Sequence, residues 1–169
     1  MTITRRKLCS ALFALGATSL AGCAGFGEEE LSENEELAVL IYGEGEYVYR
    51  TGKESLSTAF SEYEEGSLDS ALETFDQAVE FLDDASAAFE EVNQVLAEED
   101  TPLEAVDDAH ERATTLSDIA AESLSAVQAA EPDGDVPIEA VETGKDEFRD
   151  GDDWVVFTPE EIETALEEL

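Results

Sequence analysis

Apolar side chains recur along residues 67–100 at alternating steps of four and three positions. This heptad pattern places them on one stripe of a helix that packs against its partners at a shallow crossing angle, as in a helical bundle or a coiled coil. Two polar residues, Ser86 and Asn93, interrupt the stripe, and they either fix the register of the packed helices or mark a frayed end. The positions of the expected stripe are Leu68, Leu72, Phe75, Val79, Leu82, Ser86, Phe89, Asn93 and Leu96.

Residues 32–65 also carry apolar side chains at separations close to multiples of a helical turn, which predicts a second long helix. Three glycines, Gly43, Gly45 and Gly52, lie inside it, and each interior glycine costs about 1 kcal/mol relative to alanine. We therefore expect one helix with a weak or kinked middle. Its expected apolar positions are Leu37, Ile41, Val48, Leu56, Phe60 and Tyr63.

A third helix is predicted to start at the stretch "TPLEAV". Thr101 is expected to be its N-cap, Pro102 its first helical residue, and Glu104 the residue that completes a capping box. The pattern stops before "EPDGD", because proline and glycine end helices. The expected buried stripe is Val106, Ala109, Ala113, Leu116, Ala120, Leu124 and Val127.

Three helices joined by short connections predict an all-α fold, an up-down-up three-helix bundle over residues 32–131. Residues 132–169 follow as a C-terminal extension that should pack on the bundle. Its first part can form a short helix that ends near Gly144 or Gly151.

The rest of this extension contains a short extended run, "WVVF", and a second Thr-Pro start, "TPEEIETALEEL". Thr158 is expected to cap a short helix, with Glu161 at its third position. Trp154 is the expected anchor of the extension on the bundle, because a buried tryptophan contributes a large apolar surface.

The first residues of the chain have the pattern of an export leader. Arg5 and Arg6 precede the moderately apolar run Leu8–Gly22, which is too short to span a bilayer, so residues 1–22 are interpreted as a signal peptide. The stretch "TRRKL" resembles the twin-arginine export signal. That family usually has a second large apolar residue where this chain has Cys9, so export by the general secretory route stays open.

The apolar run ends in "LAGC", formed by Leu20, Ala21, Gly22 and Cys23, and this motif resembles the lipobox of prokaryotic lipoproteins. The resemblance implies cleavage before Cys23 and a lipid on its thiol, which would hold the protein on the cell membrane facing the extracellular side. Residues 23–31 would then be the lipidated cysteine and a flexible tether. The alternative is an ordinary cleavage site with a chance cysteine.

Charge narrows the set of partners. The chain has 44 acidic and 8 basic residues and a net charge of −36, and three of the basic residues (Arg5, Arg6 and Lys7) lie in the leader. Such a surface repels phosphates, so no nucleic acid partner is expected. Because 43% of the residues are hydrophobic and regularly spaced, we expect a folded protein. It resembles the acidic proteins of extreme halophiles, and an acidic mesophilic protein is the alternative.

The stretch "AFSEYEEGSLDSALETFDQA" resembles one turn and second helix of a tetratricopeptide repeat. The resemblance would imply a concave surface that binds proteins. Such repeats need neighbours to bury their faces, and the sequence has no second copy at the expected period, so a plain helical hairpin is the preferred interpretation. The positions that match are Tyr63, Gly66, Leu68, Ala71, Phe75 and Ala78.

Candidate chemistry is sparse. His110 is the only histidine and falls beside the stripe of the third helix, and no nucleophile motif accompanies it. Cys23 would be the only cysteine after the leader, so no internal disulfide is possible. The acidic clusters "EPDGD" and "RDGDDW" are interpreted as solvated turns, because neither has the ligand spacing of an EF-hand loop. The sequence therefore predicts no catalytic residues, no metal site and no cofactor.

Two functional hypotheses remain. The first is a non-catalytic protein, held on the membrane by a lipid at Cys23, that binds or spaces other proteins of the cell envelope. The alternative is an accessory module of a transporter that binds a small solute or a cation. Polar groups converging on a pocket inside the bundle would favour the second hypothesis.

Overall fold

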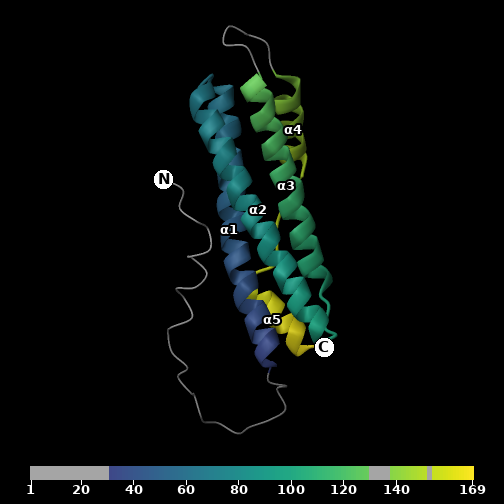
Figure 1. The fold of residues 1–169 in the computed structure, drawn as a ribbon. Helices are drawn as coiled ribbons and strands as arrows, with labels where there is room; N and C mark the ends of the chain where they lie inside the picture. The colour runs from purple at the N-terminus through teal and green to yellow at the C-terminus, as the bar shows by residue number, and fades with distance from the viewer. Residues whose placement is uncertain (1–30, 130–137, 152–153) are drawn as a thin grey trace, which may run out of the picture.

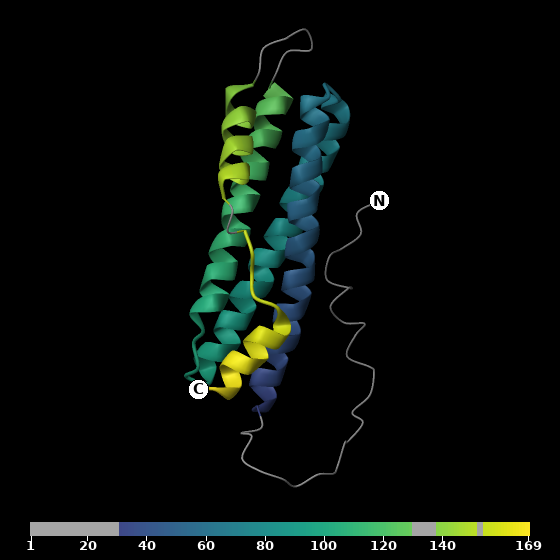
Figure 2. The same ribbon diagram turned by 180° about the vertical axis from the view of Figure 1, so that it is seen from behind.

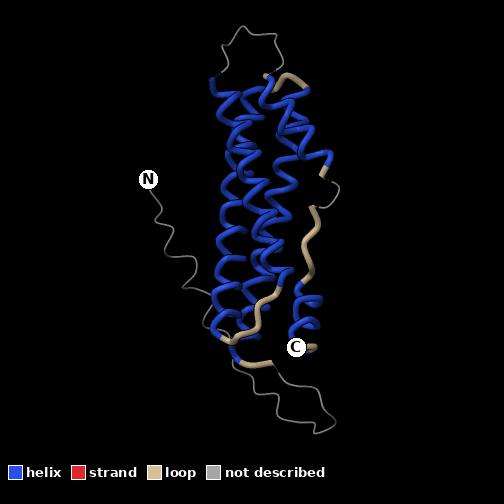
Figure 3. The backbone as a smooth tube through the Cα atoms, turned by 90° about the vertical axis from the view of Figure 1, so that its right-hand side faces the viewer, coloured by secondary structure: helices blue, strands red, loops and turns tan. Residues whose placement is uncertain are grey.

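The structure is a computed structural model that describes residues 31–129, 138–151 and 154–169. It confirms the all-α fold, and no strand occurs within these three ranges (Figure 3). The helices, labelled in Figure 1, are α1 (Glu33–Glu64), α2 (Leu68–Glu98), α3 (Glu104–Ala129), α4 (Glu139–Asp150) and α5 (Pro159–Glu167).

The three long helices alternate in direction, and α2 packs along both α1 and α3 (Figure 1). In contrast, α1 and α3 barely touch each other. The C-terminal part of the chain runs back along the open side between them. Figure 2 shows α4 beside α3, the extended stretch between α3 and α1, and α5 across the start of α1. The C-terminal segment thus takes the place of a fourth helix, which is a larger role than the expected cover on a closed three-helix bundle.

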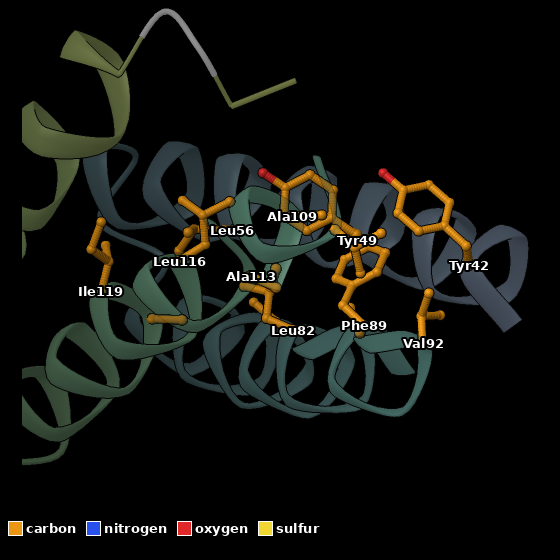
Figure 4. Packing of buried hydrophobic residues seen from close by; sticks show 14 of the residues in the cluster. Tyr42, Tyr49, Leu56, Leu82, Phe89, Val92, Ala109, Ala113, Leu116 and Ile119 are labelled. Atoms are coloured by element: carbon orange, nitrogen blue, oxygen red, sulfur yellow. The ribbon is translucent and has the colours of Figure 1, made fainter. Parts of the chain in front are cut away.

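The interface between α1 and α2 alternates large and small residues. A Cβ atom added at Gly52 would lie 2.7 Å from Cγ of Leu82, and one added at Gly45 would lie 3.0 Å from the ring of Phe89. The two helices can therefore approach closely at Gly45 and Gly52, where a large side chain of α2 fills the space that a side chain on α1 would take. Figure 4 shows part of this core. Its buried positions are Ala38, Tyr42, Gly45, Tyr49, Gly52, Leu56, Ala59 and Phe60 on α1, and Ala71, Phe75, Ala78, Leu82, Ala85, Phe89, Val92 and Leu96 on α2.

Of the expected stripe on α2, Phe75, Leu82, Phe89 and Leu96 are fully buried. Leu72 and Val79 pack against the core but are only partly buried, and Leu68 is exposed. Alanines and Val92 occupy the seam, while Ser86 and Asn93 lie half-buried beside it. On α1 the expected single helix is confirmed, and it continues through its glycines. Hydrophobicity alone favours large residues, whereas a close pair of helices selects small ones on alternate turns.

The two turns that join the three long helices end the preceding helix in the same way. Gly66 and Asp100 have positive φ angles of 77° and 60°. Beyond the second, the Thr101 amide donates to the carbonyl of Leu96 at 3.0 Å, which is the Schellman pattern. The Thr101 amide therefore caps the C-terminal end of α2. The expected capping box is wrong, because α3 begins at Glu104 and the buried Thr101 hydroxyl has no hydrogen-bond partner within the described residues.

The second Thr-Pro start behaves as expected. The Thr158 side chain accepts from the Glu161 amide at 3.3 Å, and the Glu161 carboxylate accepts from the Thr158 amide at 2.7 Å. α4 ends at Asp150, and Gly151 caps it. Unlike Thr101, Thr158 follows an extended segment rather than a helix end, so its backbone is free to start α5.

Candidate functional site

The residues predicted to carry export and lipidation lie outside the described residues. They are Arg5 and Arg6 of the export signal and Leu20, Ala21, Gly22 and Cys23 of the lipobox. The described chain starts at Leu31, which packs against the core, and Ser32 caps α1 through a capping box with Glu35. Lipidation at Cys23 therefore stays a prediction, and the candidate sites that follow belong to the helical body.

The first candidate site is the joint that holds the C-terminal segment on α1. The carbonyl of Trp154 accepts hydrogen bonds from Lys53 Nζ at 2.9 Å and from the Tyr49 hydroxyl at 3.3 Å. The Trp154 ring donates from Nε1 to the carbonyl of Phe148 at 2.9 Å. Trp154 packs against the core, as expected of an anchor, but it is only partly buried. Its backbone carbonyl makes the hydrogen bonds to α1, whereas its ring bonds within the C-terminal segment.

Burial at this joint shifts the pKa values of both hydrogen-bond donors, Tyr49 and Lys53. It raises the pKa of Tyr49 to about 12, and it lowers the pKa of Lys53. In both cases burial penalises the charged form. Tyr42 lies one heptad earlier on α1, and burial raises its pKa as well. Figure 4 shows both tyrosine hydroxyls pointing to the same side, away from Leu82.

The second candidate site is a group of charged residues between α1 and α4. Lys145 is nearly buried and pairs with Glu142 and, at 3.2 Å, with Glu64. Arg149 also contacts Glu64, at 3.0 Å. The hydrogen bond to Glu142 is the main cause that raises the pKa of Lys145, and the one from Lys145 is the main cause that lowers the pKa of Glu64. These ion pairs join α4 to the far end of α1.

A surface hollow of about 230 Å³ adjoins these ion pairs. Glu64 and Arg149, which line it, already neutralise each other, and the serine hydroxyls on its wall face solvent. A second hollow, of about 370 Å³, lies on α5 beside Phe157. Neither has a titratable group paired with a nucleophile. The residues around the first hollow are Ser57, Phe60, Ser61, Glu64, Phe148 and Arg149.

Polar contacts between α2 and α3 include the only histidine. Nδ1 of His110 lies 3.0 Å from the carbonyl oxygen of Ser86, so this nitrogen carries the proton and donates. It cannot accept the proton of the Ser86 hydroxyl, which lies 3.2 Å away and also contacts Thr114 at 2.9 Å. A serine and histidine side by side therefore cross-link two helices here and do not form a nucleophile and its base.

Two further contacts extend this polar line. Asn93 donates to Asp107 at 2.9 Å, and Ser117 donates to Asp83 at 2.5 Å. The polar interruptions of the expected stripe on α2 thus make specific contacts to α3. This agrees with the alternative that they fix register, because each donor must meet its acceptor on the facing helix.

The grouping of the acidic side chains and the hydropathy of the long helices bear on metal binding and on membrane insertion. Across residues 31–129, 138–151 and 154–169, no three His, Cys, Asp or Glu side chains are grouped to hold a metal ion. Within the same ranges no helix is long and apolar enough to cross a membrane. The cluster "EPDGD" and part of "RDGDDW" fall outside the described residues.

Comparison with known proteins gives no family for this chain: no family model, no curated protein and no solved structure matches it. The sites above therefore rest on their own geometry. Lys53 and Tyr49 were not predicted from the sequence. A signal was present for Lys53, since it is one of only five basic residues after position 22.

Proposed function

We propose that this protein is a lipid-anchored, non-catalytic helical protein on the outer side of the cell membrane, where it binds or spaces other envelope proteins. The observation that carries the proposal is the "LAGC" motif at Cys23 after a short apolar run and paired arginines. Two lipid chains or an ether-linked lipid would give stable attachment, since one acyl chain holds only marginally.

The fold supports a spacer. The start of α1, the turn between α2 and α3, and the C-terminus lie at one end of the bundle (Figures 1 and 2). The ten residues from Cys23 to Ser32, which precede α1, can span at most about 35 Å. A lipid at Cys23 would keep this end near the membrane, and the 32 residues of α1 would carry the opposite end about 48 Å further.

The described surface supports a binding or spacing role more than solute capture. The core is packed with apolar side chains, and the two hollows are open to solvent and lined largely by exposed residues. A transporter module that captures a solute would need convergent polar groups in an enclosed cavity. The acidic surface suits a setting of high salt, where screening reduces self-repulsion.

The proposal is tested by the intact mass of protein purified from membranes. We expect a chain that begins at Cys23 and carries the mass of a lipid, and a Cys23→Ser variant that leaves the membrane fraction. Replacing Arg5 and Arg6 by lysine should block export if the twin-arginine route is used. A water-soluble chain that keeps Met1 and a free Cys23 thiol would refute the proposal.

Partners would be identified by a pull-down of the native lipoprotein at high salt, followed by mass spectrometry. Consistent recovery of non-transport envelope proteins would support the spacer. Recovery of transporter subunits would favour the alternative, an accessory module for a small solute or cation.

A further inference from the structure

One side of α1 presents apolar side chains to solvent. Leu37, Leu40 and Tyr47 are 36%, 63% and 69% exposed. They are separated by three and seven positions, so they lie along one side of the helix, which is the outer face of α1. Ala38 and Tyr42, on the opposite side, are fully buried in the core that α1 shares with α2.

The outer face continues onto α5. Gly43 lies between Leu40 and Tyr47 on the helix surface, three and four positions from them. Pro159 of α5 covers this glycine, since a Cβ atom added there would lie 3.3 Å from its Cγ atom. The apolar surface extends about 15 Å from Leu37 to Tyr47, which is the rise of ten helical residues.

The surroundings of the outer face are acidic. The two basic residues of α1 are engaged elsewhere: Arg50 pairs with Glu46, and Lys53 donates to the carbonyl of Trp154. An exposed apolar surface with a polar rim is typical of a protein-binding site, and here it is set among carboxylates. The exposed acidic residues along this side of α1 are Glu33, Glu36, Glu44 and Glu54.

The spacing of the outer face fits a helix as its partner. Steps of three, four and three lead along it through Leu37, Leu40, Glu44 and Tyr47. A second helix that packs at a shallow angle meets positions with this spacing. It would take water from the Glu44 carboxylate in the middle of the line, a cost that is offset where the partner supplies a lysine or an arginine. A second copy of this chain is a poor partner, because it carries a net charge of −36.

We propose that the outer face of α1 binds an amphipathic helix of another protein, with aliphatic side chains on one stripe and lysine or arginine beside it. The aliphatic stripe covers the three exposed apolar side chains, and the basic residues pair with Glu44 and its neighbours. The inference rests on the binding role in the proposed function and names the chemistry of the partner. It does not depend on the lipid at Cys23, so its failure would leave the intact-mass test of the anchor unaffected.

The test measures binding of a synthetic peptide to the full chain with Cys23→Ser, which excludes a lipid as the binding surface. The peptide has three heptads, with leucine at the two seam positions and lysine beside them, and it carries a fluorescein label. Fluorescence anisotropy in molar KCl, where long-range attraction is screened, gives its dissociation constant. A peptide of the same composition in scrambled order should bind at least tenfold more weakly. Equal binding of the two peptides would overturn the proposal.

Variants of the full chain locate the binding surface. Leu40→Ala together with Tyr47→Ala should weaken binding of the ordered peptide at least tenfold. The matched control combines Val155→Ala with Leu169→Ala, because these side chains are similarly exposed, at 66% and 70%, outside α1. The control should stay within twofold of the parent chain, and circular dichroism confirms that all variants keep their helices. Equal effects of the two double variants would overturn the proposal.

A single carboxylate tests the charged part of the contact. Glu44→Gln should weaken binding of the ordered peptide about threefold, the effect of one exposed ion pair. Glu122→Gln makes the same change of net charge at an exposed position of α3 and should leave binding unchanged. If both variants lose the same affinity, the net charge attracts the peptide instead of the outer face, and the proposal is wrong.

A lipid surface is the competing partner for exposed apolar side chains. Vesicles of phosphatidylcholine are sedimented with the Cys23→Ser chain and with the same chain carrying Leu40→Ala and Tyr47→Ala. We expect the same fraction of both chains in the pellet, because the outer face meets protein and not lipid. A pellet fraction that falls in the double variant would assign the outer face to lipid and overturn the proposal.

Discussion

Two faces of the same helix, α1, are built differently. The face toward α2 is apolar, and glycines there are covered by large side chains of the facing helix. The face toward residues 154–169, the C-terminal arm, has two polar donors, Tyr49 and Lys53, and the site where α5 packs. Dense apolar packing makes a cooperative core, whereas a few hydrogen bonds and two buried side chains can open locally. The molecule therefore combines a stable hairpin with an arm of lower stability.

The largest expected effect is on the first face. Phe89 is fully buried and its ring lies 5.1 Å from that of Tyr42 and 6.3 Å from that of Tyr49. Phe89→Ala should lower the free energy of unfolding by about 3–5 kcal/mol, because it removes a buried ring and leaves a cavity. Urea unfolding followed by circular dichroism measures the change. Phe157→Ala on the arm is the control and should change it by less than about 0.5 kcal/mol.

Glycine replacements compare the two faces directly. Gly52→Ala should lower the free energy of unfolding by about 1–2 kcal/mol, since the new methyl group meets Leu82 and overpacking outweighs the gain in helix propensity. Gly43→Ala meets only Pro159 on the arm and should stay within about 0.5 kcal/mol. Thermal unfolding of both variants tests the contrast. Equal losses would show that the faces do not differ.

The arm has its own spectroscopic reporter, because Trp154 is the only tryptophan in the chain. Its fluorescence should change at a lower urea concentration than the helical circular dichroism signal, since the arm opens before the bundle. Ile162→Ala should widen this gap by weakening the packing of α5, whereas Val155→Ala, on the exposed side of the arm, should not. Coincident transitions in all three chains would contradict a separately opening arm.

The smallest expected effect is at alkaline pH. The pKa of Tyr49 is raised from 10.0 to about 12 in the folded protein. Below pH 10 the tyrosine is protonated in both states, so its contribution to stability is complete. Between pH 10 and about 12 the unfolded chain releases this proton first, and the free energy of unfolding falls. The urea midpoint of Tyr49→Phe should therefore fall less steeply above pH 10 than that of the unmodified chain, with Tyr47→Phe, an exposed position, as control.

Sequence patterns predict the helices of this protein better than their contacts. Heptad spacing and the Thr-Pro start at Thr158 predict where α2 and α5 form, because both signals are local. The choice between Val79 and Ala78 for the seam is not local, since it depends on how closely α1 approaches. Thr101 shows the same limit: its residue type predicts a cap, but its amide is already used to end α2.

The contacts of Trp154 with α1 are even harder to predict from local sequence patterns. Lys53 and Trp154 are separated by 101 positions, and their contact requires the arm to run back along α1. The number of basic residues marks Lys53 as unusual, but no spacing rule connects it to a backbone carbonyl. The sites predicted in the first 23 residues are the reverse case, because a processing motif is local and its interpretation does not need the fold.

The repeat of large and small residues on α1 and α2 does not determine how the two helices are aligned along their axes. Because both helices repeat every seven residues, sliding one along the other by seven would again place a bulky side chain, Leu82, opposite Gly45. Packing at the seam therefore does not by itself select one axial alignment of α1 and α2. The tight turn at Gly66 joins the helices through only three residues and permits one offset, so it determines which of several nearly equivalent alignments is the native one.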